Sequence, residues 1–389
     1  MFALPVRGAD VVVETIDGTL IEGEWLGIED SRAVRILVDR SQRVFSFDEL
    51  STVTFGNRAT APARGAEFLL VDGSRLPGKI VAAAAAGFIA KLNVGAETTL
   101  SFEHLAGVRF AQAEDSPRAA ALFEESLLDR PAGHDILISR SPEKVRAVPG
   151  RIERLGTEGG SIRVGDQSRS FRLEKVFGIV FAKGGKTVEP PPLTVMLSDG
   201  TQLGAITAST TDDALTVKST AGFVVRLAFR QIATLTFHSD RVVFLSDLPT
   251  VSQHVEGILH RSWPVRIDRS VASGPLELNG RRFKKGLGVH SRTEIIYDID
   301  GGYERFAATI GIDDIVRPAG NVEFRVIGDG RVLFESGELT GRDESRAIRV
   351  DVVGIKMLAL LVDYGKGLDL SDHADWADAR LIRPAAQSQ

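Results

Sequence analysis

A spacing that recurs along the first two thirds of the chain constrains the fold more than any other feature. Three Asp-Gly pairs each follow an apolar-rich segment, and a phenylalanine lies 38 positions after each aspartate: Asp17 and Phe55, Asp72 and Phe110, Asp199 and Phe237. The nine residues that end at each phenylalanine also agree, as FDELSTVTF, FEHLAGVRF and FRQIATLTF. A regular interval of this kind is typical of a repeated structural unit.

A fourth copy of the ending, LEKVFGIVF, finishes at Phe181, and Ser-Pro-Glu-Lys stands where the Asp-Gly turn is expected. We therefore interpret this part of the chain as four repeat units, at residues 10–56, 65–111, 135–182 and 192–238. If the units are equivalent, the four closing phenylalanines are expected at equivalent buried positions.

Each unit has the sequence pattern of short β-strands. Glycine in an Asp-Gly pair accepts the positive φ of a tight hairpin turn, and segments such as RILV and ALTVKS alternate apolar with polar residues. The shared ending, a short turn followed by a closing strand, resembles the last part of SH3-like or Sm-like small barrels. The pattern therefore predicts four small β-barrels.

The composition changes after about residue 240, because all three tyrosines, two of the three tryptophans and four of the seven histidines lie beyond that point. From Trp263 on, seven or eight short strands alternate with turns and predict a jelly-roll β-sandwich at residues 263–383, after a linker at residues 239–262. One helix, SPRAAALFEESLLDRP within residues 115–131, is expected between the second and third units. The predicted fold class is therefore all-β with one connecting helix.

Several segments of this sandwich carry a family resemblance. KGLGVH, GIDD, GDG and DHADWADARL stand in the order found in the NPCBM family, which the region from Trp263 to Arg383 resembles. The resemblance implies a galactose-binding-like β-sandwich, a non-catalytic role beside glycoside hydrolases, recognition of terminal galactose-type glycans, and bound calcium.

The segment DHADWADARLIR, Asp372 to Arg383, concentrates chemistry near the end of the chain. Calcium takes six to eight oxygen ligands from carboxylates and carbonyls, so the predicted metal ligands, with calcium in a structural role, are Asp313, Asp372, Asp375 and Asp378. The alternative is that these aspartates cap turns through backbone N–H groups. Asp378 lies within the expected last strand, so it is either buried with a partner or faces solvent.

A sugar site needs hydrogen-bonding groups for hydroxyls and an aromatic face for C–H groups. The residues predicted to contact carbohydrate are His290, Asp313, Asp314, His373, Asp375 and Trp376. Trp376 alternates with Ala377 and Ala379, so the other interpretation places it in the core. For the two histidines, the alternative is an ordinary structural role.

Other function classes find little support. A net charge of −5 gives no reason to expect nucleic acid as a partner, and the absence of cysteine excludes disulfides and cysteine nucleophiles. The repeats contain no paired acidic motif, nucleophile elbow or phosphate loop, so no enzymatic activity is expected. The longest apolar run, Ile80 to Ala90, is too short for membrane insertion, which takes roughly 20 residues.

The sequence thus predicts a non-catalytic protein that binds glycans, with an NPCBM-like module carried on β repeats. The alternative function is a protein-interaction or cell-surface scaffold whose sandwich has lost sugar binding. The first residues lack a basic segment followed by an apolar one, so either a signal peptide has been removed or the protein is cytoplasmic. The module type favours an extracellular or periplasmic bacterial location, and cytoplasmic residence is not excluded.

Overall fold

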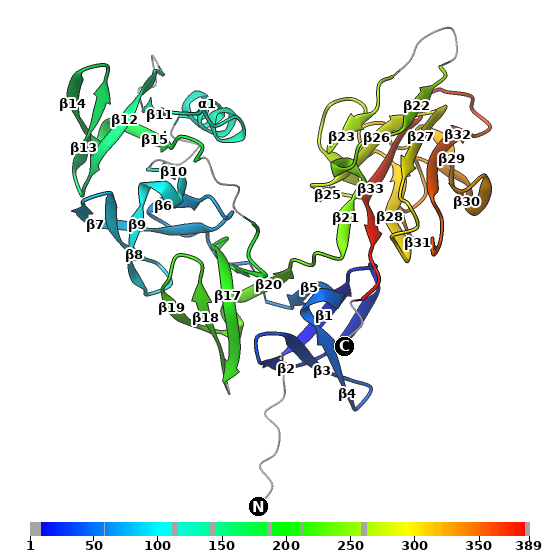
Figure 1. Ribbon diagram of the computed structural model, residues 1–389, viewed down its shortest axis with the longest axis horizontal. Coiled ribbons are helices and arrows are strands. Elements are labelled where there is room, and N and C mark those ends of the chain that lie inside the picture. Colours follow the sequence, from blue (N-terminus) through cyan, green and yellow to red (C-terminus); the bar gives the residue numbers. More distant parts are fainter. Residues whose placement is uncertain are drawn as a thin grey trace, which may run out of the picture. The chain divides into compact units, whose positions relative to one another are not determined.

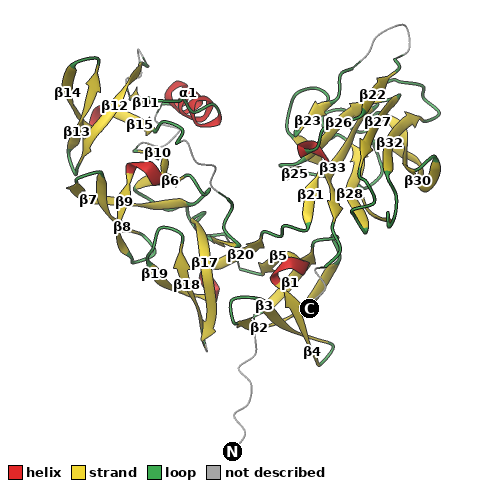
Figure 2. Cartoon of the chain, viewed as in Figure 1, coloured by secondary structure: helices red, strands yellow, loops and turns green. Residues whose placement is uncertain are grey.

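The computed structural model describes residues 9–57, 59–110, 116–140, 145–184, 189–211, 213–257 and 263–385. The chain divides into two compact units: unit 1 holds Ile21–His238 with the residues before Glu14, and unit 2 holds Glu14–Leu20 with the residues after His238. Regular structure is almost entirely β-strand, as predicted (Figure 1 and Figure 2). None of the described helices is long and apolar enough to cross a membrane.

Four segments share one strand order, in which the first strand pairs with both the second and the fifth, and the third and fourth follow outward. We call these segments repeats 1 to 4. Repeat 1 consists of β1 (Asp10–Thr15), β2 (Leu20–Glu29), β3 (Ala33–Val38), β4 (Ser41–Ser46), the 3-10 turn η1 (Phe47–Glu49) and β5 (Leu50–Phe55). Repeat 2 consists of β6 (Ala66–Leu70), β7 (Arg75–Ala84), β8 (Gly87–Leu92), β9 (Glu97–Ser101), η2 (Phe102–His104) and β10 (Leu105–Arg109).

The other two repeats follow the same order. Repeat 3 consists of β11 (Asp135–Ser139), β12 (Ala147–Leu155), β13 (Gly159–Val164), β14 (Gln167–Arg172), η4 (Leu173–Lys175) and β15 (Val176–Val180). Repeat 4 consists of β16 (Leu193–Leu197), β17 (Gln202–Thr211), β18 (Ala214–Ser219), β19 (Val224–Ala228), η5 (Phe229–Gln231) and β20 (Ile232–Phe237). The helix α1 (Pro117–Leu128) lies between repeats 2 and 3 and packs Phe123 against Phe177 of β15.

The Asp-Gly pairs form the turn between the first and second strands of repeats 1, 2 and 4. Their glycines have φ angles of 80° at Gly18, 90° at Gly73 and 88° at Gly200, a region that side chains disfavour. In each turn the aspartate Oδ1 accepts a hydrogen bond of 2.9 or 3.0 Å from the backbone N–H two residues ahead. The matching residues of repeat 3, 141–144, lie outside the described residues.

The closing phenylalanines are mostly buried. Phe55, Phe181 and Phe237 are 3%, 2% and 4% exposed, whereas Phe110 follows the end of β10 and is only partly buried. In the pair of repeats 1 and 4, each closing ring packs on the first residue of the other repeat's 3-10 turn: Phe55 on Phe229, and Phe237 on Phe47. Repeat 3 has Leu173 in that position, which offers Phe110 no aromatic ring to pack against.

The predicted barrels do not close. In the described residues the fourth strand of a repeat does not pair with its fifth strand, and each fifth strand instead pairs with that of another repeat, β5 with β20 and β10 with β15. The registers match: Val53 lies opposite Leu235, and Val108 lies opposite Ile179, each two residues before a closing phenylalanine. Each barrel therefore stays open, because the edge of its fifth strand that would pair with its own fourth strand pairs with the fifth strand of another repeat.

Unit 2 is the predicted β-sandwich. One sheet runs β23 (Arg266–Ile267), β26 (Gly286–His290), β33 (His373–Ile382), β28 (Arg305–Ile312) and β31 (Arg346–Asp351), with β21 (Val242–Phe244) also on β33. The other runs β22 (Ser252–Val255), β27 (Thr293–Asp298), β32 (Met357–Tyr364), β29 (Asn321–Gly328) and β30 (Arg331–Thr340). The described part of unit 2 also contains η6 (Leu245–Asp247) and the hairpin of β24 (Leu276–Leu278) and β25 (Arg281–Phe283).

The structure corrects the prediction of a linker at residues 239–262. Strands β21 and β22 lie within it and pair with β33 and β27, so the sandwich begins before Trp263. Both strands are short and sit at sheet margins, which is why their sequence pattern is weak. Residues 258–262 of the expected linker lie outside the described residues.

Candidate functional site

Two neighbouring strands bring two histidines together at one end of the sandwich. Strands β26 and β33 pair in a register that sets His290 opposite His373, with ring centroids 5.6 Å apart. The indole of Trp263 stacks on His290 at 5.5 Å and 15°, and lies 5.5 Å from His373. His290 is buried, whereas Trp263 is 41% exposed. We call these three residues the ring cluster, and its exposed surface is the indole.

One hydrogen bond of the ring cluster orients His290. His290 Nδ1 lies 2.8 Å from the Ser291 carbonyl oxygen, which can only accept, so Nδ1 carries the proton and neutral His290 keeps Nε2 as an acceptor. Burial lowers the pKa of His373, the neighbouring His290 lowers it further, and Asp313 opposes the shift. His373 Nδ1 is buried without a hydrogen-bond partner among the described residues. The cluster therefore offers imidazole nitrogen beside an apolar face.

A buried carboxylate fixes the loops around this cluster. Asp372 Oδ2 accepts a hydrogen bond of 2.5 Å from Ser291 Oγ, and Oδ1 accepts one of 3.0 Å from the Asn321 backbone N–H. It thereby ties the starts of β33 and β29 to the end of β26. Burial raises the pKa of Asp372, and these two hydrogen bonds oppose the shift. Because both oxygens are engaged and the side chain is fully buried, Asp372 is a loop anchor.

Two further carboxylates meet beneath the β24–β25 hairpin. Asp375 is fully buried, and neither of its oxygens accepts a hydrogen bond of normal geometry from the described residues, although the Glu277 backbone and the Asp313 carboxyl lie close enough to shift its pKa. Burial raises the pKa of Asp375 well above its usual range, and the carboxylate of Asp313 raises it further. Asp313 accepts from the Ile315 N–H at 3.0 Å through Oδ1, while its Oδ2 is buried without a partner. Such a pair needs a shared proton or a cation.

The comparison with protein families decides what this unit is. The family model described as "NPCBM/NEW2 domain" matches residues 241–382. Residues 241–382 are an NPCBM/NEW2 domain. The match begins at β21, in agreement with the sandwich margin seen in the structure, and it covers little more than a third of the chain.

Relatives of this NPCBM/NEW2 domain occur within longer proteins. A Renibacterium salmoninarum protein provisionally named endo-alpha-N-acetylgalactosaminidase is 34% identical over 108 residues, 28% of this chain and 7% of that protein. Alpha-1,3-galactosidase B of Akkermansia muciniphila is 32% identical over 117 residues, 29% of this chain and 15% of that protein. The chain thus spans only a small part of the length of these relatives.

Among solved structures, the chain is similar to a CBM51 module from Clostridium perfringens GH95 in complex with methyl-galactose. The identity is 29%, the TM-score is 0.33, and the alignment covers 36% of this chain and 99% of that module. NPCBM is a carbohydrate-binding module family, and unit 2 accordingly has the architecture of a binding module whose relatives accompany glycosidases.

The NPCBM/NEW2 domain brings together only some of the residues predicted for its site. Trp376 is fully buried and packs edge-on between Phe324 at 4.9 Å and Phe306 at 6.2 Å, so the platform role is wrong and the core interpretation holds. Successive side chains of β33 point to opposite faces of the sheet, so the side chain of Trp376 faces the sandwich core and those of His373 and Asp375 face the other way. Asp314 accepts from the backbone N–H groups of Asn279 and Gly280.

Asp378 does not join the other predicted metal ligands. It has a φ of 49° at a bulge in β33, and its electrostatic surroundings are Arg380, Arg281 and Glu14. Burial raises the pKa of Asp378, and these arginines oppose the shift. In the described residues no group of three or more histidine or acidic side chains is arranged to hold a metal.

Sequence reasoning missed Trp263 as a site residue. It stands before the recognisable strands and has no alternating neighbours that would assign it to a core face. That isolation is the available signal: a tryptophan outside any amphipathic pattern has no core face to occupy.

Proposed function

We propose that the NPCBM/NEW2 domain binds a terminal galactose-type sugar and that the chain is not itself an enzyme. The observation that carries this proposal is the ring cluster, in which a partly exposed indole stacks on His290 and lies beside His373. The names of the two relatives, both enzymes of galactose-type sugars, support the choice of sugar. The same module type favours a location outside the cytoplasm.

The chemistry of the cluster suits a sugar ring. A galactose-type sugar has an apolar face of C–H groups, which packs on indole, and hydroxyls that donate to imidazole nitrogen. Asp372 contributes by holding the three loops in place, and Trp376 by anchoring the strand that carries His373. A shallow site with one aromatic surface is expected to bind weakly, with Kd ~0.1–10 mM, worth roughly 3–5 kcal/mol.

We also propose that calcium binds at the carboxylates of Asp313 and Asp375. Three oxygens of these two buried carboxylates, Asp313 Oδ2 and both of Asp375, lack donors among the described residues and fit a cation. They supply only part of the oxygen set that calcium requires. Backbone carbonyls and water must therefore complete the site. Addition of calcium to chelator-treated protein is expected to raise the melting temperature of unit 2, because the ion binds only the folded state. An unchanged melting temperature at millimolar calcium contradicts this proposal.

The sugar proposal is tested by titrating the full chain with methyl-galactoside, with methyl-glucoside as the epimer control. Trp25 and Trp376 are buried, so a change in tryptophan fluorescence on binding reports Trp263. Trp263→Ala is expected to abolish binding, and Trp263→Phe to weaken it. The matched control is Val353→Ala, which removes another exposed apolar side chain of the same unit and should leave binding unchanged.

Absence of binding across a broad glycan panel, from folded and calcium-loaded protein, favours the second candidate function. That candidate is a protein-interaction or cell-surface scaffold. The exposed leucines of the loop before β33, Leu368 and Leu370 at 63% and 78%, favour it because such side chains suit a protein partner.

A further inference from the structure

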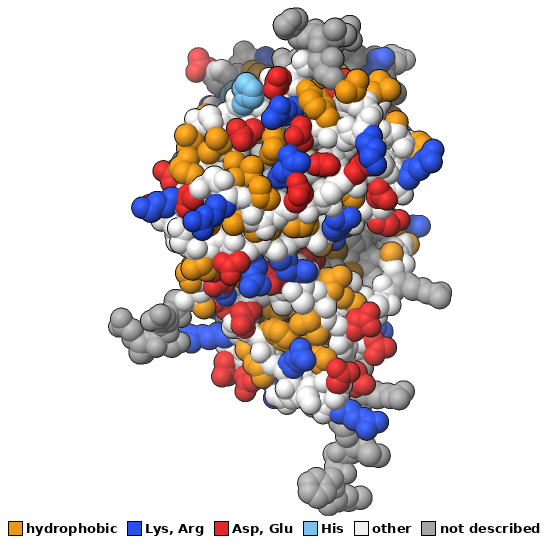
Figure 3. Space-filling model, turned by 90° about the vertical axis from the view of Figure 1, so that its right-hand side faces the viewer, with side chains coloured by type: hydrophobic (Ala, Val, Ile, Leu, Met, Phe, Trp, Pro, Cys, Tyr) orange, Lys and Arg blue, Asp and Glu red, His pale blue; other side chains and the backbone are white. Residues whose placement is uncertain are grey.

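The four repeats differ sharply in charge although they share one fold. Repeat 1, residues 10–56, has ten acidic and four basic residues, a net charge of −6. Repeat 3, residues 135–182, has six acidic and nine basic residues, a net charge of +3. Repeats 2 and 4 have no net charge: repeat 2 has four acidic and four basic residues, and repeat 4 has three acidic and three basic residues. Figure 3 shows the side of the molecule that lies on the right in Figure 1. In the upper part of that view, acidic and basic side chains are interspersed.

Strand pairing places the two charged repeats at opposite ends of a row. Repeat 1 pairs with repeat 4 through β5 and β20, repeat 4 with repeat 2 through β17 and β7, and repeat 2 with repeat 3 through β10 and β15. The spatial order is therefore 1, 4, 2, 3, which Figure 1 shows for unit 1. Among the described strands none of repeat 1 pairs with one of repeat 3. The row has an acidic end, a neutral middle and a basic end.

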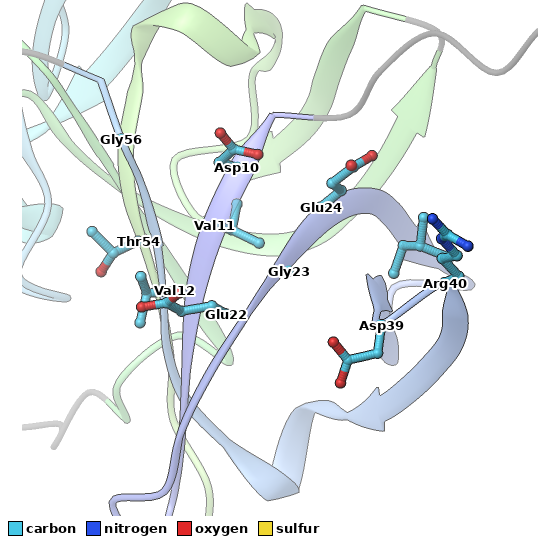
Figure 4. A pocket seen from close by; sticks show the side chains of 11 residues that line it. Asp10, Val11, Val12, Glu22, Gly23, Glu24, Asp39, Arg40, Thr54 and Gly56 are labelled. Carbon is cyan, nitrogen blue, oxygen red and sulfur yellow. The ribbon is translucent and has the colours of Figure 1, made fainter.

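The acidic end contains a groove of about 550 Å³ in repeat 1. Figure 4 shows the carboxylates of Asp10, Glu22, Glu24 and Asp39 around it, with Arg40 at one side. None of these four carboxylates has an ion-pair partner among the described residues. The uncompensated charge of the end is therefore concentrated where the surface is hollow.

The basic end is the outer face of β12, β13 and β14. Their registers place Arg151 opposite Arg163, Arg154 opposite Ser161, and Arg172 opposite Gly159, so the four arginines share one exposed face. Arg163 pairs with Glu153 and Arg172 lies 3.6 Å from Glu174, whereas Arg151 and Arg154 have no ion-pair partner among the described residues. Strand β14 pairs only with β13 in the described part of the chain, so this face continues onto a free edge.

We propose that the acidic groove of repeat 1 docks on the arginine face of repeat 3 of a second copy of the chain. The two surfaces are complementary in charge, and the neutral repeats 4 and 2 keep them apart within one molecule. The contact joins two different surfaces, so it is heterologous and does not close on itself unless the rotation permits a ring. Copies therefore associate head to tail into short chains, and the association weakens with salt because its attraction is between solvent-exposed charges.

The test is sedimentation velocity of the full chain over a concentration series at 25 and 500 mM sodium chloride. At low salt the weight-average mass is expected to rise about twofold or more with concentration and to return to that of one chain at high salt. Arg151→Glu with Arg154→Glu changes the net charge of repeat 3 from +3 to −1, so that both ends are acidic. Glu22→Lys with Glu24→Lys changes the net charge of repeat 1 from −6 to −2 and replaces two of the four groove carboxylates with ammonium groups, which repel the arginine face. Each double variant alone is expected to remain single, and an equimolar mixture of the two is expected to associate.

The matched control is Lys218→Glu with Arg226→Glu in neutral repeat 4, which changes the net charge as much as the repeat 3 variant does and should still associate. Circular dichroism establishes that every variant is folded. The proposal is overturned if the wild type stays single at low salt, if the end variants associate like the wild type, or if their mixture does not associate. Binding of the arginine face to dextran sulfate by a chain that stays single also overturns it, in favour of an acidic polysaccharide.

Discussion

Asp135 of repeat 3 and Asp375 of the sandwich are both buried, yet their surroundings differ completely. The oxygens of Asp135 accept backbone hydrogen bonds of 2.8 Å from Ile152 and 2.9 Å from Ala182. The oxygens of Asp375 accept no hydrogen bond of normal geometry from the described residues. A satisfied carboxylate stabilises the segments it joins, whereas an unsatisfied one costs free energy that only a proton or a ligand recovers. Asp135 thus has a structural role like that of Asp372 in the sandwich, whereas Asp375 has no comparable set of donors.

The largest expected effect tests whether the repeats are held by their shared ending. Phe55→Ala should lower the free energy of unfolding of unit 1 by about 3–5 kcal/mol, because the ring is buried against Trp25 and Phe229. Phe110→Ala is the control, and its effect should be clearly smaller because Phe110 is only partly buried. Urea unfolding followed by circular dichroism measures both. If both variants lose the same free energy of unfolding, the difference in burial between Phe55 and Phe110 has no energetic consequence, which contradicts the prediction.

The second prediction tests the satisfied carboxylate. Asp135→Asn keeps the size of the side chain but replaces one acceptor oxygen with an N–H₂ group that faces a backbone donor. The variant is expected to lose about 1–3 kcal/mol, the cost of one buried donor without a partner. The same urea experiment measures it, and an unchanged midpoint shows that the backbone hydrogen bonds of Asp135 contribute nothing.

The fold was predictable from sequence where local chemistry repeats. The Asp-Gly turns and the closing phenylalanines indicate where strands begin and end. Each depends on one residue, a glycine that adopts positive φ or a phenylalanine ring that is buried, and can therefore be recognised locally. What the sequence did not reveal was that the closing strands of two repeats pair with each other, since Val53 and Leu235 are apolar in a closed barrel as well. The pairing depends on surfaces far apart in the chain, and one sequence contains no direct record of them.

The site was only partly predictable for a related reason. His290 and His373 were identified because family motifs surround them, but the chemistry of an aspartate depends on which face of β33 it occupies. The bulge at Asp378 changes the alternation of that strand, so Asp375 and Asp378 have different surroundings despite their similar spacing. Trp263 was missed and Trp376 misassigned because exposure is a property of the packed sandwich.

The third prediction concerns a carboxylate that favours its charged form. Burial opposes ionisation of Asp17, but hydrogen bonds from the hydroxyls of Thr15 and Thr19 and from the Thr19 N–H help lower its pKa from 3.8 to about 2. A depressed folded-state pKa stabilises the protein above the unfolded value and loses that contribution as pH falls toward 2. Asp17→Asn should therefore cost about 1 kcal/mol at pH 6 and much less near pH 2. Thr15→Val, which removes one donor, should shrink this pH dependence; a difference that is constant with pH contradicts the assignment.

The smallest expected effect has the opposite sign and distinguishes the two regions most directly. In the presence of a chelator, Asp375→Asn should leave the melting temperature unchanged or raise it slightly, which corresponds to a gain of less than about 1 kcal/mol in the free energy of unfolding. The reason is that an uncharged amide replaces a carboxyl group whose charged form is disfavoured by burial and by Asp313. In calcium, the same variant should lose the stabilisation expected for the wild type, because a ligand has been removed. Thermal unfolding in both conditions gives the comparison, with Asp135→Asn as the matched control. If Asp375→Asn destabilises the chelated protein as strongly as Asp135→Asn does, then Asp375 is a structural carboxylate with partners of its own. Asp135 and Asp375 then have the same structural role, and the proposed difference between them is wrong. If instead only the calcium response disappears, the burial of Asp375 is explained by the ion it holds.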